Sequence, residues 1–255
     1  IKCSCYVPRV IKCYTTEHWI SRTIMPAFAE GCGGQVVPPV TLLEGPAAMY
    51  GVLRGCGEVI RNCVDVGRDY WYIDHGYTNP SQHTKGEFAG NYRVVFNGRQ
   101  AKPGESDGRR FKAEIRPWKR RGKHILVIPL TKAVSDFYNM PQRDWLETVI
   151  REVATYTDRP IRIKEKGEGN IHQSLKDCWC LVTHSSNTAV DALLEGVPVI
   201  TLGESAVSGL SWKFGHIENP YWPDREPVLW GLADNQFTLA EMRSGLCAEM
   251  MKIAG

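Results

Sequence analysis

No stretch of the 255 residues is apolar enough to cross a membrane. A membrane-spanning helix needs roughly 20 consecutive apolar residues, and every apolar run in this sequence is much shorter. The first residues, Ile1 to Val10, include charged residues and a proline and contain no apolar signal core. We therefore expect no membrane span and a cytoplasmic location. Internal repeats and low-complexity segments are also missing, so we expect an ordinary globular protein.

The spacing that marks a zinc site is missing as well. Of the nine cysteines, the close pairs Cys3/Cys5 and Cys178/Cys180 are spaced Cys-x-Cys. A zinc site has two Cys-x-x-Cys pairs or a Cys/His quartet. Alternation along a strand puts both members of each pair on one sheet face, where a free cysteine behaves as a small apolar residue. We predict reduced, buried thiols and no metal, which suits a cytoplasmic compartment.

The net charge of +3 is small, but the positive charge is concentrated in one strip. Two interpretations are open: a solvated linker, or a strip that contacts the phosphates of a nucleic acid or a nucleotide. Within the strip only Glu114 opposes the basic residues, which are Arg109, Arg110, Lys112, Arg116, Lys119, Arg120, Arg121 and Lys123.

The second half of the sequence alternates between short apolar runs and amphipathic runs. Apolar, β-branched runs are typical of buried parallel strands, and apolar residues at helical spacing indicate helices between them. This alternation predicts a doubly wound parallel sheet. The predicted strands are 124–130, 160–164, 179–183 and 197–202, and the predicted helices are 144–156, 171–177 and 185–194.

The first half has a similar but less regular pattern. It predicts strands at 9–14, 35–37, 70–74 and 92–96, and helices at 17–30 and 46–61. The fold class is therefore α/β, with two Rossmann-like halves whose parallel sheets face a central cleft. A final helix over 238–253 is expected to pack across both halves. The predicted divisions are 1–104, a basic linker at 105–123, a second domain at 124–205, and a crossing tail at 206–255.

One polar run stands where a predicted strand gives way to a helix. In an open α/β sheet, ligands bind beyond the carboxyl ends of the strands, where helix N-termini expose backbone N–H groups. A carboxylate one turn into the helix, Asp191, can reach a ribose diol. The alternative is an ordinary helix cap, because Ser, Asn and Thr favour that position anyway. The polar residues of the run are His184, Ser185, Ser186, Asn187 and Thr188.

The run His184-Ser-Ser-Asn-Thr-Ala-Val-Asp191-Ala-Leu-Leu-Glu-Gly-Val-Pro-Val-Ile200 resembles the donor-binding helix of GT-B glycosyltransferases. It is most similar to capsule-type sugar transferases and to phage-encoded glycosyltransferases thought to modify DNA. Further similarity lies in Ile217-Glu-Asn-Pro220 and Pro223-Asp-Arg-Glu226. Sugar-nucleotide epimerases share the Gly-x-Pro-Val part of the motif. The resemblance implies a metal-independent hexosyltransferase that binds a nucleotide-sugar donor, a UDP-sugar first of all, in the 124–205 domain, with the acceptor on the 1–104 side.

Positive side chains would then have to stabilise the leaving diphosphate in place of a metal. The candidates are Lys132, after the first strand of the second half, with Arg162 and Lys164 on the next strand. Arg162 and Lys164 alternate onto one face, so both could serve together. Each could equally be a solvated surface charge.

An inverting transferase needs a base for the proton of the acceptor hydroxyl. Asp74 ends an apolar strand and is followed by His75 and Gly76. We expect Asp74 to be the base, with His75 as the alternative base or as the residue that orients Asp74. The competing interpretation is a turn capped by Asp74. Arg93 is a weaker candidate for the same site, on the acceptor side.

The acceptor is suggested by the basic strip and by the resemblance. Positive charge and aromatic residues suit a nucleic acid, and the phage-type resemblance suggests the hydroxymethyl group of a modified pyrimidine such as 5-hydroxymethylcytosine in phage DNA, in the host cytoplasm. The alternatives are a surface or capsular polysaccharide, a sugar-nucleotide epimerase, and a non-catalytic nucleic-acid-binding protein. The sequence leaves open whether the configuration is inverted or retained, and whether the protein is a monomer or a homodimer.

Overall fold

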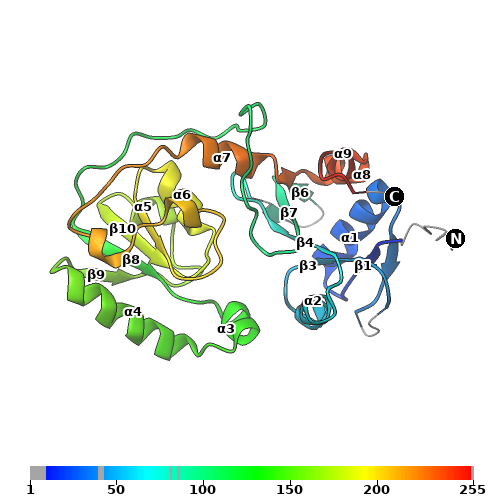
Figure 1. Cartoon of the computed structure of the whole chain (residues 1–255), viewed down its shortest axis with the longest axis horizontal. Helices are drawn as coiled ribbons and strands as arrows, with labels where there is room; N and C mark the ends of the chain where they lie inside the picture. The colour runs from blue at the N-terminus through cyan, green and yellow to red at the C-terminus, as the bar shows by residue number, and fades with distance from the viewer. Residues whose placement is uncertain (1–9, 40–42, 81, 85–86, 254–255) are drawn as a thin grey trace, which may run out of the picture. The chain divides into compact units, whose positions relative to one another are not determined.

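The computed structural model describes residues 10–39, 43–80, 82–84 and 87–253. The chain folds into two compact units (Figure 1). The first unit comprises Ile1–Arg99 and Asn235–Gly255, and the second comprises Gln100–Asp234. The predicted tail at 206–255 is thus shared, because the chain returns to the first unit after Asp234.

The first unit is built on a six-stranded sheet with the strand order β12-β7-β4-β3-β1-β2. The four strands β1 to β4 run parallel, β7 is antiparallel to β4, and β12 is antiparallel to β7. The two-residue strand β12 comes from the C-terminal segment. The bounds are β1 (Lys12–Tyr14), β2 (Gln35–Val37), β3 (Ala47–Tyr50), β4 (Tyr70–His75), β7 (Tyr92–Phe96) and β12 (Gln236–Phe237), with a separate hairpin of β5 (Gln82–Thr84) and β6 (Glu87–Ala89).

Two predicted helices of the first unit are wrong in part. The predicted helix at 46–61 begins with the buried strand β3, and helix α2 (Cys56–Asp65) starts only after Gly51 and Gly55, whose φ angles are +68° and +88°. The predicted helix at 238–253 is two short helices, α8 (Leu239–Arg243) and α9 (Leu246–Met250), because Gly245 has a φ of +87°. Both breaks fall where glycine adopts a left-handed conformation.

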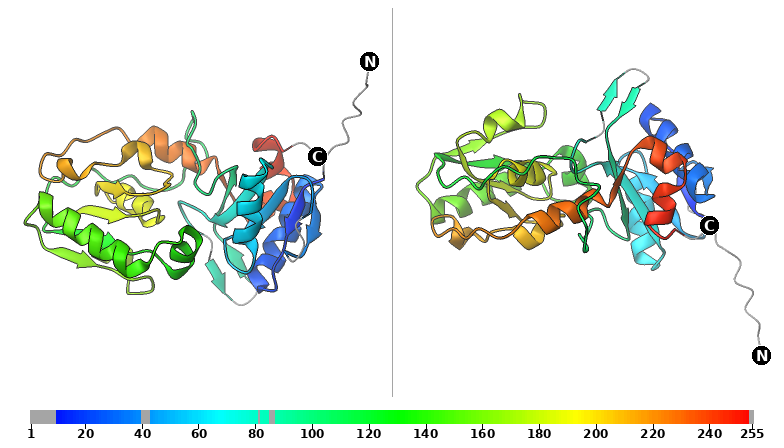
Figure 2. Two further views of the ribbon diagram at one scale, coloured as in Figure 1. Left: turned by 60° about the horizontal axis from the view of Figure 1, so that its bottom comes forward. Right: turned by 90° about the horizontal axis from the view of Figure 1, so that it is seen from above.

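The C-terminal helices pack on helix α1 (Trp19–Cys32) of the same unit (Figures 1 and 2). Met242, Cys247 and Ala248 share a buried core with Ile24 and Phe28 of α1. The backbones approach closely at Gly31, where an added Cβ would lie 1.8 Å from the carbonyl oxygen of Met242. Helices α8 and α9 therefore contribute to the core of the first unit.

The second unit contains a four-stranded, fully parallel sheet with the order β11-β10-β8-β9. Every residue of β8 and β10 is buried, as the uninterrupted apolar runs predict. Helix α4 covers one face, and α5 and α6 lie together on the other (Figure 1). The strands are β8 (His124–Ile128), β9 (Ile161–Ile163), β10 (Cys178–Thr183) and β11 (Val199–Thr201), and the helices are α3 (Lys132–Tyr138), α4 (Gln142–Tyr156), α5 (Ile171–Ser174), α6 (Thr188–Leu194) and α7 (Glu226–Ala233), with 3-10 turns at Ser208–Leu210 and Phe214–His216.

This strand order creates a switch point in the second sheet. The chain leaves β8 toward β9 on one side, and later returns past β8 to form β10 on the other. The connections after β8 and β10 therefore diverge, and ligands of doubly wound sheets bind in the crevice that this divergence leaves. The same argument places a switch point of the first sheet between β1 and β3.

The cysteines are packed as small apolar residues. The seven that lie among the described residues are buried and carry free thiols, as predicted. Cys3 and Cys5 lie outside the described residues. Burial raises the pKa of the Cys178 thiol to about 12, so this thiol stays protonated and unreactive near neutral pH.

Residues 101–123, most of them in the predicted basic linker, form neither helix nor strand and belong to the second unit. The backbone N–H of Arg116 donates to the carbonyl of Leu194 at 2.9 Å, and that of Lys119 donates to the carbonyl of Gly196 at 2.8 Å. The segment is thus tied to the C-terminal end of α6.

Gly196 is where we expect an alanine to be strongly destabilising. Its φ is +76°, and an added Cβ would lie 2.1 Å from the carbonyl oxygen of Pro117. A left-handed backbone costs about 1–2 kcal/mol for a residue with a Cβ and overpacking costs about 1–3 kcal/mol, so Gly196→Ala should lower the free energy of unfolding in urea by about 3 kcal/mol. Gly209→Ala is the control, because an added Cβ there meets nothing within 4 Å. Equal stability of the two variants would contradict this packing.

Candidate functional sites

The predicted polar run lies at the carboxyl edge of the second sheet, directly after β10. His184 is buried, and its ring packs flat against Gly203, where an added Cβ would lie 2.1 Å from the ring atom Cε1. The Tyr138 ring centroid lies 5.0 Å from that of His184, and His184 Nδ1 lies 3.1 Å from Ser185 Oγ. The loops after β8, β10 and β11 therefore meet around one fixed imidazole.

The residues that follow His184 are half-buried and polar. The Thr188 hydroxyl donates to Ser186 Oγ at 3.0 Å, and the Thr188 backbone N–H lies 3.3 Å from the same oxygen. Asn187 occupies the N-cap position of α6 without a side-chain capping bond. The Gln100 amide donates to the Ser185 carbonyl at 3.2 Å. The structure thus brings Ser185, Ser186, Asn187 and Thr188 into one ordered polar loop.

Asp191 lies one turn into α6 and is an unusual acid. Burial raises the pKa of Asp191 to about 6. The charge of His172 opposes this rise, and the nearby carboxylate of Glu195 adds to it. A carboxyl group that is held in a desolvated position next to another acid is unfavourable for folding. Such groups are typical of binding and catalytic sites.

The free energy of unfolding should depend on the ionisation of Asp191. Because the pKa of Asp191 is raised on folding, its favourable contribution is complete below about pH 4 and is lost as the pH rises through about 6. Asp191→Asn should therefore be more stable than the wild type by about 1–3 kcal/mol at pH 8, and the difference should vanish near pH 4. Urea unfolding at the two pH values measures this, with the exposed Asp158→Asn as control. A difference that does not change with pH would contradict the assignment.

The three predicted donor-site cations are placed differently from one another. Lys132 begins α3 at the carboxyl end of β8, and its exposed amine forms an ion pair with Asp136 at 2.7 Å. Lys164 follows β9, and its amine donates to the carbonyls of Glu168 and Gly169 in the next turn. His124, at the amino end of β8, is buried, and burial lowers its pKa. The positive charge of Arg162 lowers the pKa of His124 further. Lys132 and Lys164 lie at the carboxyl edge, and Arg162 acts toward the opposite edge.

In the first unit Asp74 is held from three directions at the end of β4. Its Oδ2 accepts hydrogen bonds from the Tyr72 hydroxyl at 2.5 Å and from Arg93 Nη2 at 3.1 Å. Its Oδ1 accepts from the backbone N–H of His75 at 2.8 Å. Burial opposes ionisation, but the charge of Arg93 and these hydrogen bonds outweigh it, so the pKa of Asp74 lies below its ordinary value. Asp74 is thus a structural carboxylate with low basicity.

His75 is placed differently from Asp74. Its side chain is exposed, and its Nε2 lies 3.5 Å from the hydroxyl of Tyr50 at the end of β3. Asp74 and Arg93 hold the strand end from which His75 projects. Arg93 is buried and its guanidinium also lies over the rings of Tyr72 and Tyr77, so Arg93 supports this site from within the core.

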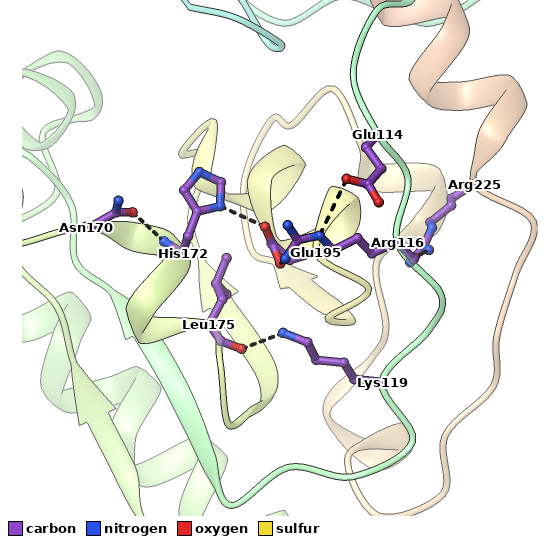
Figure 3. A network of polar contacts seen from close by, with 8 residues as sticks. All are labelled: Glu114, Arg116, Lys119, Asn170, His172, Leu175, Glu195 and Arg225. Carbon is purple, nitrogen blue, oxygen red and sulfur yellow. Dashed lines mark hydrogen bonds and ion pairs between the residues drawn. The ribbon is translucent and has the colours of Figure 1, made fainter.

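The basic strip is largely engaged by its own unit. Arg116 forms an ion pair with Glu195 at 2.8 Å, and Lys119 donates to the carbonyl of Leu175 (Figure 3). Arg120 lies over the Trp222 ring. Arg109 pairs with Asp107 at the surface, and Arg110 is half-buried. Lys112 and Arg121 are exposed. The strip is therefore not one continuous row of exposed positive charge.

Some residues that build these sites carry no signal in the sequence. Glu195 is one, because its buried carboxylate joins Arg116 to His172 (Figure 3). Tyr50 and Gln236 are others, because their contacts with the segment from Asp74 to Thr78 connect separate strands. The alternation in Tyr70-Trp-Tyr-Ile-Asp74 could have placed Tyr72 and Asp74 on one face.

Among residues 10–39, 43–80, 82–84 and 87–253, no cluster of three or more His, Cys, Asp or Glu side chains could hold a metal ion. None of the helices in this described part is both long and apolar enough to cross a membrane.

Comparison with known proteins shows the fold. No protein-family model and no curated protein matches the sequence. Among solved structures, the chain is similar to the β-Kdo 2,4-transferase KpsC of Thermosulfurimonas dismutans, with a TM-score of 0.52 and 12% sequence identity. The similarity covers 88% of this chain and 90% of that one. The predicted α/β fold of the GT-B type is thereby confirmed.

Proposed function

We propose that this protein is a glycosyltransferase that moves a sugar from a nucleotide-sugar donor to a hydroxyl acceptor. The observation that carries the proposal is the polar loop at the switch point of the second sheet, where His184 is fixed and a partly desolvated acid, Asp191, follows. The fold shared with a Kdo transferase supports it.

The donor, a UDP-sugar in the first instance, is assigned to the carboxyl edge of the second sheet. Asp191 is suited to a ribose diol, and the loop hydroxyls are suited to the diphosphate. Both side chains of the Lys132–Asp136 ion pair are exposed, so the pair contributes little to stability. A diphosphate can therefore displace Asp136 and recruit Lys132 as the group that stabilises the leaving group without a metal.

Acceptor activation is assigned to His75 in the first unit. In the proposed step His75 takes the proton from the acceptor hydroxyl while the hydroxyl oxygen bonds to the anomeric carbon. The bond from that carbon to the diphosphate oxygen breaks, and the nucleoside diphosphate leaves with the electron pair. Asp74 and Arg93 hold the strand end and do not exchange protons themselves.

Two acceptor classes follow from different observations. A modified pyrimidine of DNA, with its hydroxymethyl oxygen as nucleophile, is favoured by the exposed cations at Arg109, Lys112 and Arg121. A surface polysaccharide is favoured by the likeness to KpsC. Arg116 is paired with Glu195, and Lys119 donates to the carbonyl of Leu175, so these two cations contribute less to binding of DNA phosphates.

Calorimetric titration with a panel of nucleotide sugars tests the donor assignment. We expect one of them to bind with a Kd between about 1 μM and 1 mM, and Asp191→Asn to weaken binding at least 10-fold, because a charged hydrogen bond is lost. The control Asp158→Asn lies in the loop before β9, at the other edge of the sheet, and should bind as the wild type does. No binding by any nucleotide sugar, or equal binding by Asp191→Asn, would contradict the proposal.

A further inference from the structure

The turn that follows His75 is held by a residue from the far end of the chain. Gln236, in strand β12, is 3% exposed. Its Oε1 accepts hydrogen bonds from the backbone N–H groups of Tyr77 at 2.8 Å and of Thr78 at 3.1 Å. Its Nε2 donates to the Thr78 hydroxyl. One buried amide thus satisfies two successive backbone donors and one side chain of the turn.

A second set of bonds closes the turn from the opposite side. The Gly76 N–H donates to the carbonyl of Asn91 at 2.8 Å, and the Asn91 amide donates to the carbonyl of Thr78 at 3.1 Å. Gly76 fits between these groups, because an added Cβ would lie 2.7 Å from the Asn91 carbonyl oxygen and 2.9 Å from Gln236 Oε1. These contacts therefore restrict the backbone conformation of Gly76 to Thr78, and Gln236 supplies the contacts on one side of the turn.

We infer that Gln236 is a positioning residue for His75: through its bonds to Tyr77 and Thr78, the C-terminal segment fixes the direction in which the His75 side chain projects. This inference rests on the proposed role of His75 in transfer. The side chain of Gln236 contacts the turn rather than a substrate, so its loss should slow the reaction without changing donor binding.

The reason is the cost of unsatisfied buried donors. Without the amide oxygen, the N–H groups of Tyr77 and Thr78 lose a buried acceptor, and each such loss favours rearrangement of the turn. A displacement of about 1 Å at a reacting group can reduce a rate about 100-fold. Gln236→Met removes the acceptor at nearly constant volume, whereas Gln236→Glu keeps an acceptor oxygen for both N–H groups and for the Thr78 hydroxyl.

A control is available at the amino end of strand β4, whose carboxyl end carries His75. Asn97 Oδ1 accepts the N–H of Tyr70 at 2.8 Å, and its amide donates to Asp69 at 2.8 Å. Asn97 is exposed, so Asn97→Ala removes a less buried side-chain clamp from the amino end of β4, away from His75.

The experiment measures sugar transfer and amide hydrogen exchange in full-length wild type, Gln236→Met, Gln236→Glu and Asn97→Ala. We expect Gln236→Met to lower kcat about 10- to 100-fold with the donor KM within about 2-fold of wild type. The Tyr77 and Thr78 amides should lose protection, Gln236→Glu should restore most of both, and Asn97→Ala should leave kcat unchanged.

Two results would overturn the inference: an unchanged kcat in Gln236→Met, or equal losses of kcat in Gln236→Met and Asn97→Ala. If the wild type transfers no sugar, the proposed function fails. The positioning inference is then decided by exchange of the Tyr77 and Thr78 amides and by the NMR signals of the His75 ring, which must shift in Gln236→Met and not in Asn97→Ala.

Discussion

Replacing Arg93 with methionine is expected to lower the free energy of unfolding by about 3 kcal/mol at pH 7. The Arg93 side chain is 5% exposed and that of Asp74 is 25% exposed, and their ion pair measures 3.1 Å. Removing one partner of a buried ion pair leaves the other charge desolvated, which costs about 3–5 kcal/mol. The partial exposure of Asp74 places the expected loss at the lower end of that range.

The loss should depend on pH in a definite direction. In the wild type the pKa of Asp74 is below its ordinary value, so its contribution to stability is present at neutral pH and is lost as the pH falls below about 4. Without Arg93, burial dominates and the pKa of Asp74 rises. The deficit of Arg93→Met should therefore shrink as the pH falls from 7 to 4 in urea unfolding.

The exposed ion pair of Arg143 with Glu147 provides the control for this experiment. Both of its side chains are more than half exposed, at 86% and 55%, and Arg143→Met should change stability by less than about 1 kcal/mol. A loss in Arg93→Met that is just as small, or a deficit that grows on acidification, would show that the charge of Asp74 does not depend on Arg93.

Replacing His75 with glutamine is expected to reduce the rate of sugar transfer by about 10²- to 10⁴-fold, the usual contribution of a general base. Donor affinity should stay unchanged, because the proposed donor contacts lie in the second unit. His216→Gln in the second unit is the matched control. If Asp74→Asn abolishes transfer while His75→Gln retains it, the base is Asp74 and the assignment made from hydrogen bonding and pKa is wrong.

The sequence was informative where local pattern determines structure. The buried runs 124–130 and 179–183 correspond to β8 and β10, because continuous apolar, β-branched residues suit parallel strands. The predicted strand at 35–37 corresponds to β2. Strand β3 was missed, because Ala47 and Ala48 are small residues that also favour helices. Helix α3 was missed as well, since its seven residues are too few to show a periodic pattern.

The candidate sites could be predicted only in part, for a related reason. The positions of the loop His184–Thr188 and of Asp74 and His75 at strand ends could be predicted, because polar residues follow apolar runs there. Their roles remain predictions. The sequence could not reveal that Asp74 forms an ion pair with Arg93, nor that Gln236 accepts hydrogen bonds from the turn after His75. Both contacts join segments far apart in the chain. The proposal of His75 over Asp74 as the base depends in part on such a long-range contact, the ion pair of Asp74 with Arg93.

Glycosyl transfer itself is the measurement that tests this account most directly. Purified protein would be incubated with the nucleotide sugar that it binds and with three acceptors: DNA containing hydroxymethylated pyrimidines, unmodified DNA, and a surface-type oligosaccharide. The products would then be weighed by mass spectrometry. The account predicts a gain of one sugar residue on an acceptor hydroxyl, formed much more slowly by His75→Gln and by Asp191→Asn but at the wild-type rate by His216→Gln. A gain on the hydroxymethylated nucleoside or on the oligosaccharide would identify the acceptor, whereas no gain on any acceptor, or a gain that survives both substitutions, would contradict the account.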